Sequence, residues 1–315
     1  MSLVLDWIHV FKISKKIAFW DILSGIYLYP KFQNKMTYSF VKKKDQAVTN
    51  YIKKNFNDLI NAYRQVSTDS LKPAKKVVWT VWWQGECEAP PMIRGCIASI
   101  RKCFFDYEVI VVTKDNYKDY IDIPALIMDK VEKKQITFIH LSDFIRVSLL
   151  ARYGGIWADA TLYCSDVHPN IEAYEFFTLR DEMPAIRYWP CKGRWNVYFM
   201  CSNSVGYPLF SFMRDVFIEY CKKEDYLVEY FLIDYMISVA YDEFPYIRKQ
   251  IDKVPITTHY QDELVGYLND CFSIKKYRYL LKVNWASKLN RHHDYMLQSD
   301  GEQTFYSFMF KKYLQ

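Results

Sequence analysis

The sequence contains few glycines, no closely spaced pair of cysteines and no long apolar run. Only nine of the 315 residues are glycine, so a pair of adjacent glycines is informative here. The eight cysteines include no C-x-x-C pair, which argues against a zinc site or a disulfide framework and favours a reducing environment. No segment approaches the roughly 20 apolar residues that a membrane-spanning helix needs. We therefore expect a cytoplasmic protein without a spanning segment.

The composition is that of a globular protein with a mild positive charge. Hydrophobic residues make up 51% and charged residues 25% of the chain, which is long enough for one large domain or two modest ones. The net charge of +6 suits anionic substrates or an anionic membrane surface but requires neither. Basic residues alternate with aromatic ones, yet they are too dilute and unclustered for nucleic-acid binding. We expect no nucleic-acid partner.

The first part of the chain is predicted to form a helical extension. Residues 38–65 follow a helical period, and the segment 67–73 has the composition of a linker. This places a boundary near residue 70, between an N-terminal helical extension (1–70) and a main domain (71–315). The extension either packs on the main domain, which we favour, or makes peripheral contact with an anionic membrane surface. Its candidate membrane-contacting residues are Trp7, Lys12, Lys15, Lys16 and Trp20.

The main domain alternates predicted strands and helices. Strand 107–113 is expected to be buried because it is apolar and rich in β-branched residues. The alternation predicts an α/β fold with a parallel sheet covered by helices on both faces. The predicted strands are 76–85, 107–113, 156–158, 176–180 and 196–201, and the predicted helices are 89–100, 136–153, 208–220 and 228–241. Segment 115–129 is predicted to hold short helical pieces.

Segment 136–164, ITFIHLSDFIRVSLLARYGGIWADATLYC, contains the strongest signal in the sequence. Apolar residues recur at helical spacing, with Asp143 and Arg146 on another face, so the first half is predicted to be an amphipathic helix. The glycine pair 154–155 would end this helix, because glycine accepts the positive φ of a tight turn. A short apolar strand then carries Asp159 at its end.

Asp143, Arg146 and Asp159 are candidates for one ligand site. Each has an ordinary explanation alone, because an Asp–Arg pair on a helix is commonly a surface ion pair and a glycine pair commonly caps a helix. In the compact order S-D-x-x-R, Y-G-G-I-W and D-x-T, these groups would instead be carried to the ends of strands, where open α/β sheets bind ligands. We predict that the three side chains meet around one anionic ligand.

The same block resembles the sugar-nucleotide signature of GT-A glycosyltransferases of the family 32 type, which include capsular polysaccharide synthesis proteins and, more distantly, the glucosylating clostridial toxins. The match is close from Ser142 to Thr161 and looser from about Lys75 to the C-terminal region. The resemblance implies a GT-A, Rossmann-like sheet and hexosyl transfer with retention of configuration in bacterial surface polysaccharide synthesis. It implies a nucleotide-sugar donor, with a UDP-sugar favoured, and we favour a lipid-linked oligosaccharide as the acceptor.

By this resemblance, Asp143 would contact the ribose or the donor sugar, Arg146 the donor, and Asp159 the nucleotide sugar and its metal environment. The second aspartate of the family's D-x-D motif is Thr161 here. Asp159 and Thr161 are thus the candidate ligands of a divalent metal, Mn²⁺ or Mg²⁺. Because a hydroxyl binds a hard cation less well than a carboxylate does, the departure weakens the expectation of metal dependence. It also leaves a catalytically silent nucleotide-sugar-binding module as the alternative function.

Two adjacent tryptophans stand at the end of the first predicted strand of the main domain. In the segment V-W-W-Q-G, the resemblance assigns stacking on the nucleobase to Trp82, and Trp83 is a second candidate for donor binding. Packing in the core is the alternative interpretation for either indole.

Asp234 and Lys288 are further candidates. Asp234 stands among apolar neighbours in Y-F-L-I-D-Y, and a buried carboxylate is normally paired or functional. A similar segment in the capsular family makes Asp234 a candidate for acceptor binding or catalytic support, and a structural ion pair is the alternative. Lys288 corresponds by resemblance to a basic residue facing the donor diphosphate, although a solvated loop lysine is the simpler interpretation. His259, His292 and His293 lack the spacing of a zinc site.

Overall fold

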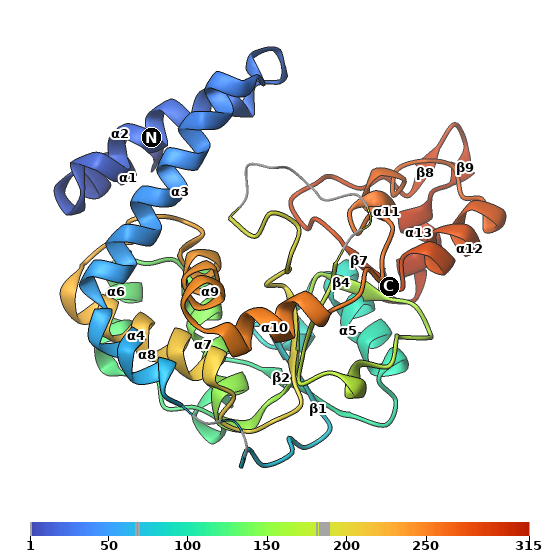
Figure 1. The fold of residues 1–315 in the computed structure, drawn as a ribbon. Coiled ribbons are helices and arrows are strands. Elements are labelled where there is room, and N and C mark those ends of the chain that lie inside the picture. The colour runs from blue at the N-terminus through green and yellow to red at the C-terminus, as the bar shows by residue number, and fades with distance from the viewer. Residues whose placement is uncertain (1, 67, 69, 181, 183–189, 315) are drawn as a thin grey trace.

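A five-stranded sheet in the order β2-β1-β3-β6-β5 lies at the centre of the computed structural model, which describes residues 2–66, 68, 70–180, 182 and 190–314 (Figure 1). β1 runs parallel to β2 and β3, whereas β6 runs antiparallel to β3 and β5. The α/β class is therefore confirmed. The sheet is mixed, however, whereas the sequence predicted a parallel one. The strands are β1 (Val77–Val81), β2 (Glu108–Val112), β3 (Gly155–Ala158), β5 (Phe176–Thr178) and β6 (Phe199–Ser202).

The connections explain the mixed sheet. Each parallel pair among β1, β2 and β3 is joined through at least one α-helix, as a parallel crossover requires. Among the described residues between β3 and β6 there is no α-helix, and the chain returns in antiparallel pairs instead. β2 is also an edge strand in which Glu108 is exposed and only Val112 is buried, so the prediction of a buried strand was wrong.

Two small sheets lie outside the central one. β4 (Leu162–Cys164) pairs antiparallel with β7 (Ala286–Lys288), and β8 (Gln298–Ser299) pairs with β9 (Glu302–Gln303). The β4–β7 pair joins the chain just after β3 to a segment more than 120 residues later. This pairing positions one of the site residues described below.

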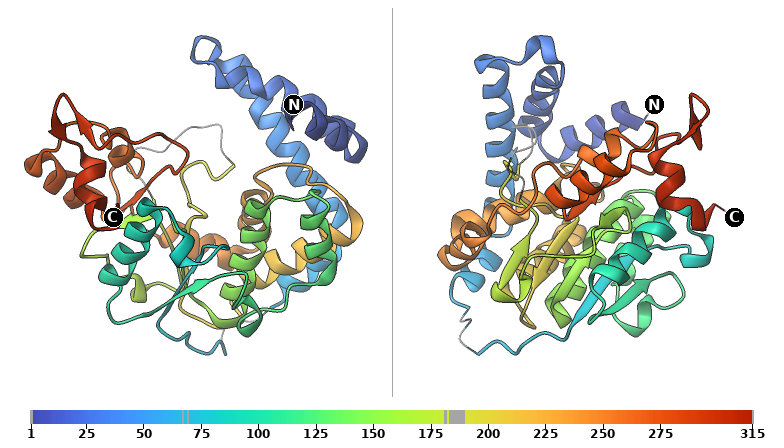
Figure 2. Two further views of the ribbon diagram at one scale, coloured as in Figure 1. Left: turned by 180° about the vertical axis from the view of Figure 1, so that it is seen from behind. Right: turned by 90° about the vertical axis from the view of Figure 1, so that its right-hand side faces the viewer.

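Helices lie on both sides of the central sheet (Figures 1 and 2). α6, α7 and α8 gather on one side and α5 on the other, and the C-terminal helices pack beyond α5. The N-terminal helices are α1 (Ser2–Ile13), α2 (Lys15–Ser24), α3 (Lys35–Asn55) and α4 (Asn57–Arg64). The others are α5 (Pro91–Cys103), α6 (Ala125–Glu132), α7 (Phe138–Tyr153), α8 (Pro208–Lys223), α9 (Leu232–Glu243), α10 (Pro245–Lys253), α11 (Glu263–Gly266), α12 (Ile274–Val283) and α13 (Phe305–Phe310).

Helix α7 is buried along most of its length. It was predicted to be amphipathic, but its side chains from His140 to Ala151 are buried except for Ser142, which is half-buried. The reason is that α8 covers one side of α7 while β1 and β3 cover another. Asp143 and Arg146 therefore lie inside the protein and not on a solvated helix face, which gives their charges more influence on each other.

The turn between α7 and β3 requires both of its glycines. Gly154 and Gly155 have φ values of +66° and +85°, which side chains rarely tolerate. A Cβ on Gly155 would lie 2.6 Å from both the carbonyl oxygen and Cγ1 of Val77 on β1. A Cβ on Gly154 would lie 2.7 Å from the carbonyl oxygen of Ser204. The predicted glycine turn is confirmed, and it allows β3 to approach β1 directly after the helix.

The N-terminal helices differ in how closely they join the body. α3, α4 and Phe56 between them share the main core through Val48, Ile52 and Ile60. α1 packs on α2 and α2 packs on α3, and both helices project away from the sheet (Figure 1). The boundary near residue 70 falls between α4 and β1, where residues 67 and 69 lie outside the described part of the chain, and it stays a prediction. No helix among the described residues is both long and apolar enough to cross a membrane.

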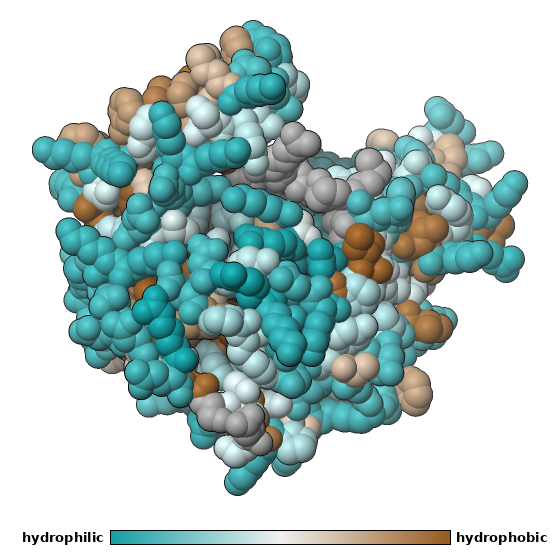
Figure 3. Space-filling view, in the orientation of Figure 1, coloured by the Kyte–Doolittle hydropathy of each residue, from teal (hydrophilic) through white to brown (hydrophobic). Residues whose placement is uncertain are grey.

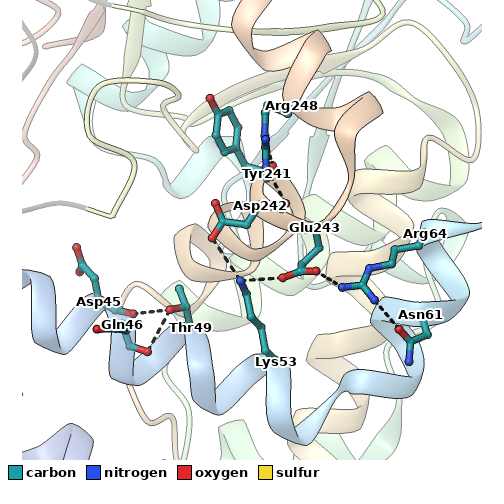
Figure 4. A network of polar contacts seen from close by, with 10 residues as sticks. All are labelled: Asp45, Gln46, Thr49, Lys53, Asn61, Arg64, Tyr241, Asp242, Glu243 and Arg248. Carbon is teal, nitrogen blue, oxygen red and sulfur yellow. Dashed lines mark hydrogen bonds and ion pairs between the residues drawn. The ribbon is translucent and has the colours of Figure 1, made fainter.

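An ion-pair network holds α3 and α4 against the body. Lys53 of α3 lies 3.5 Å from a carboxylate oxygen of Asp242 and 2.8 Å from one of Glu243, at the end of α9. Arg64 of α4 pairs with the same Glu243 (Figure 4). Arg248 of α10 donates hydrogen bonds to the carbonyl oxygens of Tyr241 and Asp242, which closes the end of α9. α3 is thus a fixed support for the two helices before it.

Candidate functional site

Asp159, directly after β3, is the centre of a charged cluster built from three elements. Its Oδ1 accepts hydrogen bonds from Arg146 Nη2 at 3.1 Å and from the indole Nε1 of Trp157 at 2.7 Å. Its Oδ2 accepts a hydrogen bond from Lys288 Nζ at 2.6 Å. α7, β3 and β7 thus each supply one donor to a single carboxylate. About a quarter of the side chains of Asp159 and Lys288 stays exposed, 23% and 25%, so this pair can meet a ligand.

Lys288 reaches Asp159 because β7 pairs with β4. Leu162, three residues after Asp159, lies opposite Lys288 in this pairing. The amide of Leu289 donates to the carbonyl oxygen of Thr161, and the amide of Lys288 donates to that of Gln261, each at 2.9 Å. Lys288 is therefore part of an ordered strand, and the interpretation of a solvated loop lysine was wrong.

Arg146 lies beneath this pair and is only 5% exposed. Its Nη1 lies 3.3 Å from Oδ1 of Asp143, and its guanidinium carbon lies 4.9 Å from the ring of Trp157. The structure thus brings together the three side chains that the sequence places in one site. Because Arg146 is enclosed, its main contacts are with Asp143 and Asp159, and it holds both carboxylates in place.

The carboxylates of the site have different proton affinities. Burial raises the pKa of Asp143 to about 7, against the pull of Arg146. Burial also raises the pKa of Asp234 to about 6, although the indole of Trp195 and the charge of Arg146 oppose it. Burial acts on Asp159 too, but Lys288 and Arg146 outweigh it, so the pKa of Asp159 lies below its ordinary value. Asp159 is therefore the most firmly ionised of the three carboxylates at neutral pH.

Asp143 should make folding stability depend on pH. Its folded pKa of about 7 exceeds the ordinary 3.8, so the folded chain retains a proton that the unfolded chain releases between these values. Its contribution to stability is therefore present at low pH and falls as the pH rises to about 7. Replacing Asp143 by asparagine removes this dependence. As the pH is raised from about 4.5 to about 7.5, the unfolding free energy of Asp143→Asn should rise by about 1 to 4 kcal/mol relative to that of the unchanged chain.

Urea unfolding of both chains at the two pH values measures this difference, with the lower pH as the internal reference. A stability difference between the two chains that is unchanged, or that moves against the variant as the pH rises, would contradict the raised pKa.

A cavity of about 180 Å³ opens beside Lys288. Asp234 and Asp262 lie in its wall, together with the aromatic rings of Trp195, Tyr198 and Phe231. Its volume is small for a whole nucleotide sugar but leaves room for one sugar ring. Carboxylates that accept hydrogen bonds from hydroxyls, together with aromatic faces, are the groups that a sugar ring needs.

Asp234 and Asp262 enter this cavity from different elements. Oδ1 of Asp234, on α9, accepts a hydrogen bond from Trp195 Nε1 at 2.9 Å, and within the described residues Asp234 forms no ion pair. Its predicted acceptor-side role stays a prediction. Asp262 precedes α11, and burial raises its pKa although Lys288 opposes the shift. Asp262 was not predicted from the sequence, because no local pattern marks it. Its position depends on its neighbour Gln261, whose oxygens accept hydrogen bonds from the amide of Lys288 on β7 and from the side chain of Asn196.

Trp82 and Trp83 face different parts of the protein. Trp83 lies against the rings of Tyr117 and Phe138, at centroid distances of 5.3 and 6.2 Å, beside the main core. Trp82 packs on the smaller C-terminal core, and the guanidinium carbon of Arg291 lies 5.6 Å from its ring. Both indoles are half-buried. Their predicted part in donor binding stays a prediction.

The residues around Asp159 do not fit a divalent metal ion. Both oxygens of Asp159 already face cationic groups, and Thr161 offers only a neutral hydroxyl. In the part of the chain that the structure describes, no three His, Cys, Asp or Glu side chains are grouped closely enough to hold a metal. The ammonium of Lys288 lies where it would repel a cation bound to Oδ2.

Comparisons with known proteins found similarity to one family and to a solved structure. A solved structure described as "PaToxG Glycosyltransferase" is similar over 66% of this chain and 83% of that chain, with 14% identity and a TM-score of 0.39. No curated protein of similar sequence was found. The family described as "Capsular polysaccharide synthesis protein" matches residues 29–309, which is most of the chain. The chain therefore belongs to the capsular polysaccharide synthesis protein family.

Proposed function

We propose that this chain is a glycosyltransferase that moves a hexosyl group from a nucleotide sugar to a polysaccharide acceptor in bacterial capsule or surface polysaccharide synthesis. Membership of the capsular family supports the pathway. The observation that carries the chemistry is the contact between Lys288 and Asp159, 2.6 Å long, at the edge of a cavity with room for one sugar ring.

In this proposal, Lys288 stabilises the charge that develops when the sugar–phosphate bond breaks. Transfer releases a nucleoside diphosphate, and a fixed cation at the leaving oxygens lowers the barrier most when it is already in place. Asp159 orients Lys288 and accepts a hydrogen bond from a donor hydroxyl. Arg146 is a positioning residue, because it is enclosed and holds Asp159 and Asp143. Asp143 remains a candidate for a ribose or sugar hydroxyl through the 10% of its side chain that is exposed.

The cavity would hold the sugar against its acceptor. Asp234 and Asp262 would accept hydrogen bonds from sugar hydroxyls, and Tyr198 and Phe231 would pack on the ring. Trp82 would stack on the base of the nucleotide. No carboxylate is assigned as a nucleophile, so retention of configuration rests on the family resemblance alone, as does the GT-A architecture.

The family resemblance also supports the finer assignments. We propose a UDP-sugar as the donor and a lipid-linked oligosaccharide as the acceptor, and we place the reaction in the cytoplasm at the inner face of the membrane. A lipid-linked acceptor would be presented at that surface, so the enzyme would work as a peripheral protein.

We expect transfer to proceed without a divalent metal, because the Lys288 ammonium would supply the positive charge that a metal supplies elsewhere. The test incubates the protein with UDP- and GDP-sugars and a lipid-linked acceptor, with either Mn²⁺ or EDTA present, and follows free nucleotide and product mass. Turnover should change by less than about twofold on adding EDTA.

Two results would contradict parts of this proposal. Complete loss of turnover in EDTA would show that a metal is required and that Lys288 does not replace it. Tight donor binding without nucleotide release, under either condition and with every acceptor tried, would favour a catalytically silent nucleotide-sugar-binding module. The replacement of the second D-x-D aspartate by Thr161 is the feature that motivates this alternative.

A further inference from the structure

Exposed apolar side chains are concentrated on the N-terminal helices. Among the described residues, ten of the 23 large apolar side chains that are exposed lie within residues 7–36. They include Trp7, Ile8 and Phe11 on α1, Phe19 and Ile22 on α2, and Phe32 before α3. We call the exposed apolar side chains of residues 7–36 the arm surface. Figure 3 shows apolar residues gathered on the face of the projecting helices.

The arm surface is additional to the apolar side that packs inward. Val10 of α1 and Ile17 and Ala18 of α2 are buried in the core that these helices share with α3. Phe19 and Ile22, at 55% and 45% exposure, are three residues apart and face outward. A surface helix normally needs one apolar side. A second one on neighbouring helices indicates a binding surface.

The charge around the arm surface identifies the partner. Residues 7–36 contain five lysines, Lys12, Lys15, Lys16, Lys31 and Lys35, and a single acidic residue, Asp21. Asp21 is already paired with Lys44 at 3.1 Å. Two of the lysines adjoin exposed rings, with Lys15 Nζ 5.6 Å from the centroid of Phe11 and Lys31 Nζ 5.0 Å from that of Phe32. Cations bordering exposed aromatic and aliphatic groups complement an anionic lipid surface, whereas a second copy of the same surface would be repelled.

The arm is held in a fixed position. Lys44 on α3 is only 3% exposed and bridges Asp21 on α2 to Glu229, which precedes α9, at 3.1 and 3.0 Å. The network around Lys53 fastens the next turns of α3 to the body (Figure 4). Burying the arm surface against the body would break these contacts. The surface therefore stays available to an external partner.

We propose that residues 7–36 bind the surface of an anionic membrane. The apolar side chains of α1, α2 and the segment before α3 enter the headgroup region, and the lysines contact lipid phosphates. The binding needs no spanning segment, since amphipathic helices bind through buried apolar area together with attraction to anionic lipid. This inference does not rest on the proposed glycosyl transfer, because lipid binding and turnover are measured separately.

Sedimentation with lipid vesicles tests the proposal. The full chain is mixed with vesicles of phosphatidylcholine alone and with vesicles that also contain phosphatidylglycerol. We expect binding to the anionic vesicles that weakens with added salt. The double variant Phe11→Ser, Phe19→Ser should bind them at least about tenfold more weakly. The double variant Lys15→Glu, Lys31→Glu should lose the preference for phosphatidylglycerol.

The matched control is Phe105→Ser, because Phe105 is 84% exposed but lies between α5 and β2, away from the arm. This variant should bind as the unchanged chain does. A thermal melt of each variant checks folding. The proposal is overturned if the unchanged chain ignores anionic vesicles, or if the arm variants bind as well as the control. It is also overturned if sedimentation without lipid shows a dimer that the arm variants abolish, since the partner would then be a second copy.

Discussion

Replacing Asp159 by asparagine should lower glycosyl transfer by at least about 10³-fold. Asp159 accepts hydrogen bonds from Arg146, Trp157 and Lys288, and the two cations keep its pKa below the ordinary value, so it is ionised at neutral pH. Asparagine keeps the shape but offers one acceptor oxygen and no charge. Lys288 then loses the partner that fixes its ammonium, and a donor hydroxyl loses its acceptor. Product formation from a nucleotide sugar measures the effect.

The matched control for this variant is Asp166→Asn. Asp166 follows β4, seven residues after Asp159, and its exposed carboxylate pairs with Lys102 at 2.8 Å. An exposed pair of this kind contributes little to stability, and we expect turnover within about twofold of the unchanged chain. Unfolding midpoints separate lost catalysis from lost folding. An Asp159→Asn protein that folds and retains its turnover would remove Asp159 from the proposed chemistry.

The part of the site that could be predicted from sequence is the part made by local structure. A buried helix, two glycines and a short strand occupy consecutive residues, so their spacing alone brings Asp143, Arg146 and Asp159 together. The glycine pair was informative because each position has a positive φ and no space for a Cβ. Local rules of this kind need no knowledge of the rest of the fold.

The other half of the site depends on contacts between distant residues. Lys288 lies 129 positions from Asp159 and reaches it only through the β4–β7 pairing. β7 has three residues, too few for a periodic signal, so its lysine looked like a loop residue. Asp262 was missed for a similar reason. The near-complete burial of α7 also could not be predicted, because it depends on α8, which begins more than 50 residues after α7 ends.

These distant contacts change the roles within the site. From sequence, Arg146 was the main cation expected to meet the donor, and Lys288 was a second candidate facing the diphosphate. In the structure Arg146 is 5% exposed, whereas a quarter of the Lys288 side chain is accessible beside the cavity. The accessible cation at the rim is therefore supplied by β7, and the buried one supports it through Asp159. We therefore expect Lys288 to stabilise the leaving diphosphate more than Arg146 does.

Replacing Lys288 by methionine should therefore lower turnover by about 10²-fold or more, while a Lys288→Arg variant should retain a measurable part of it. Methionine preserves the apolar stem but removes the ammonium that faces Asp159 and the cavity. The pKa of Asp159 should also rise, because Lys288 is the strongest of the cations that lower it. The acid limb of the pH–rate profile of Lys288→Met should accordingly lie at higher pH than that of the unchanged chain.

The matched control is Lys102→Met, since Lys102 is 69% exposed and pairs with Asp166 outside the site. A second variant tests whether Lys288 stands in for a metal. Adding Thr161→Asp to Lys288→Met restores a second carboxylate near Asp159 and removes the competing cation, so turnover should return in Mn²⁺ and vanish in EDTA. If Lys288→Met is as active as Lys102→Met, the leaving diphosphate is stabilised elsewhere. If the single variant alone recovers fully in Mn²⁺, Asp159 and Thr161 already hold the metal once the competing ammonium is removed, and the second carboxylate is not needed.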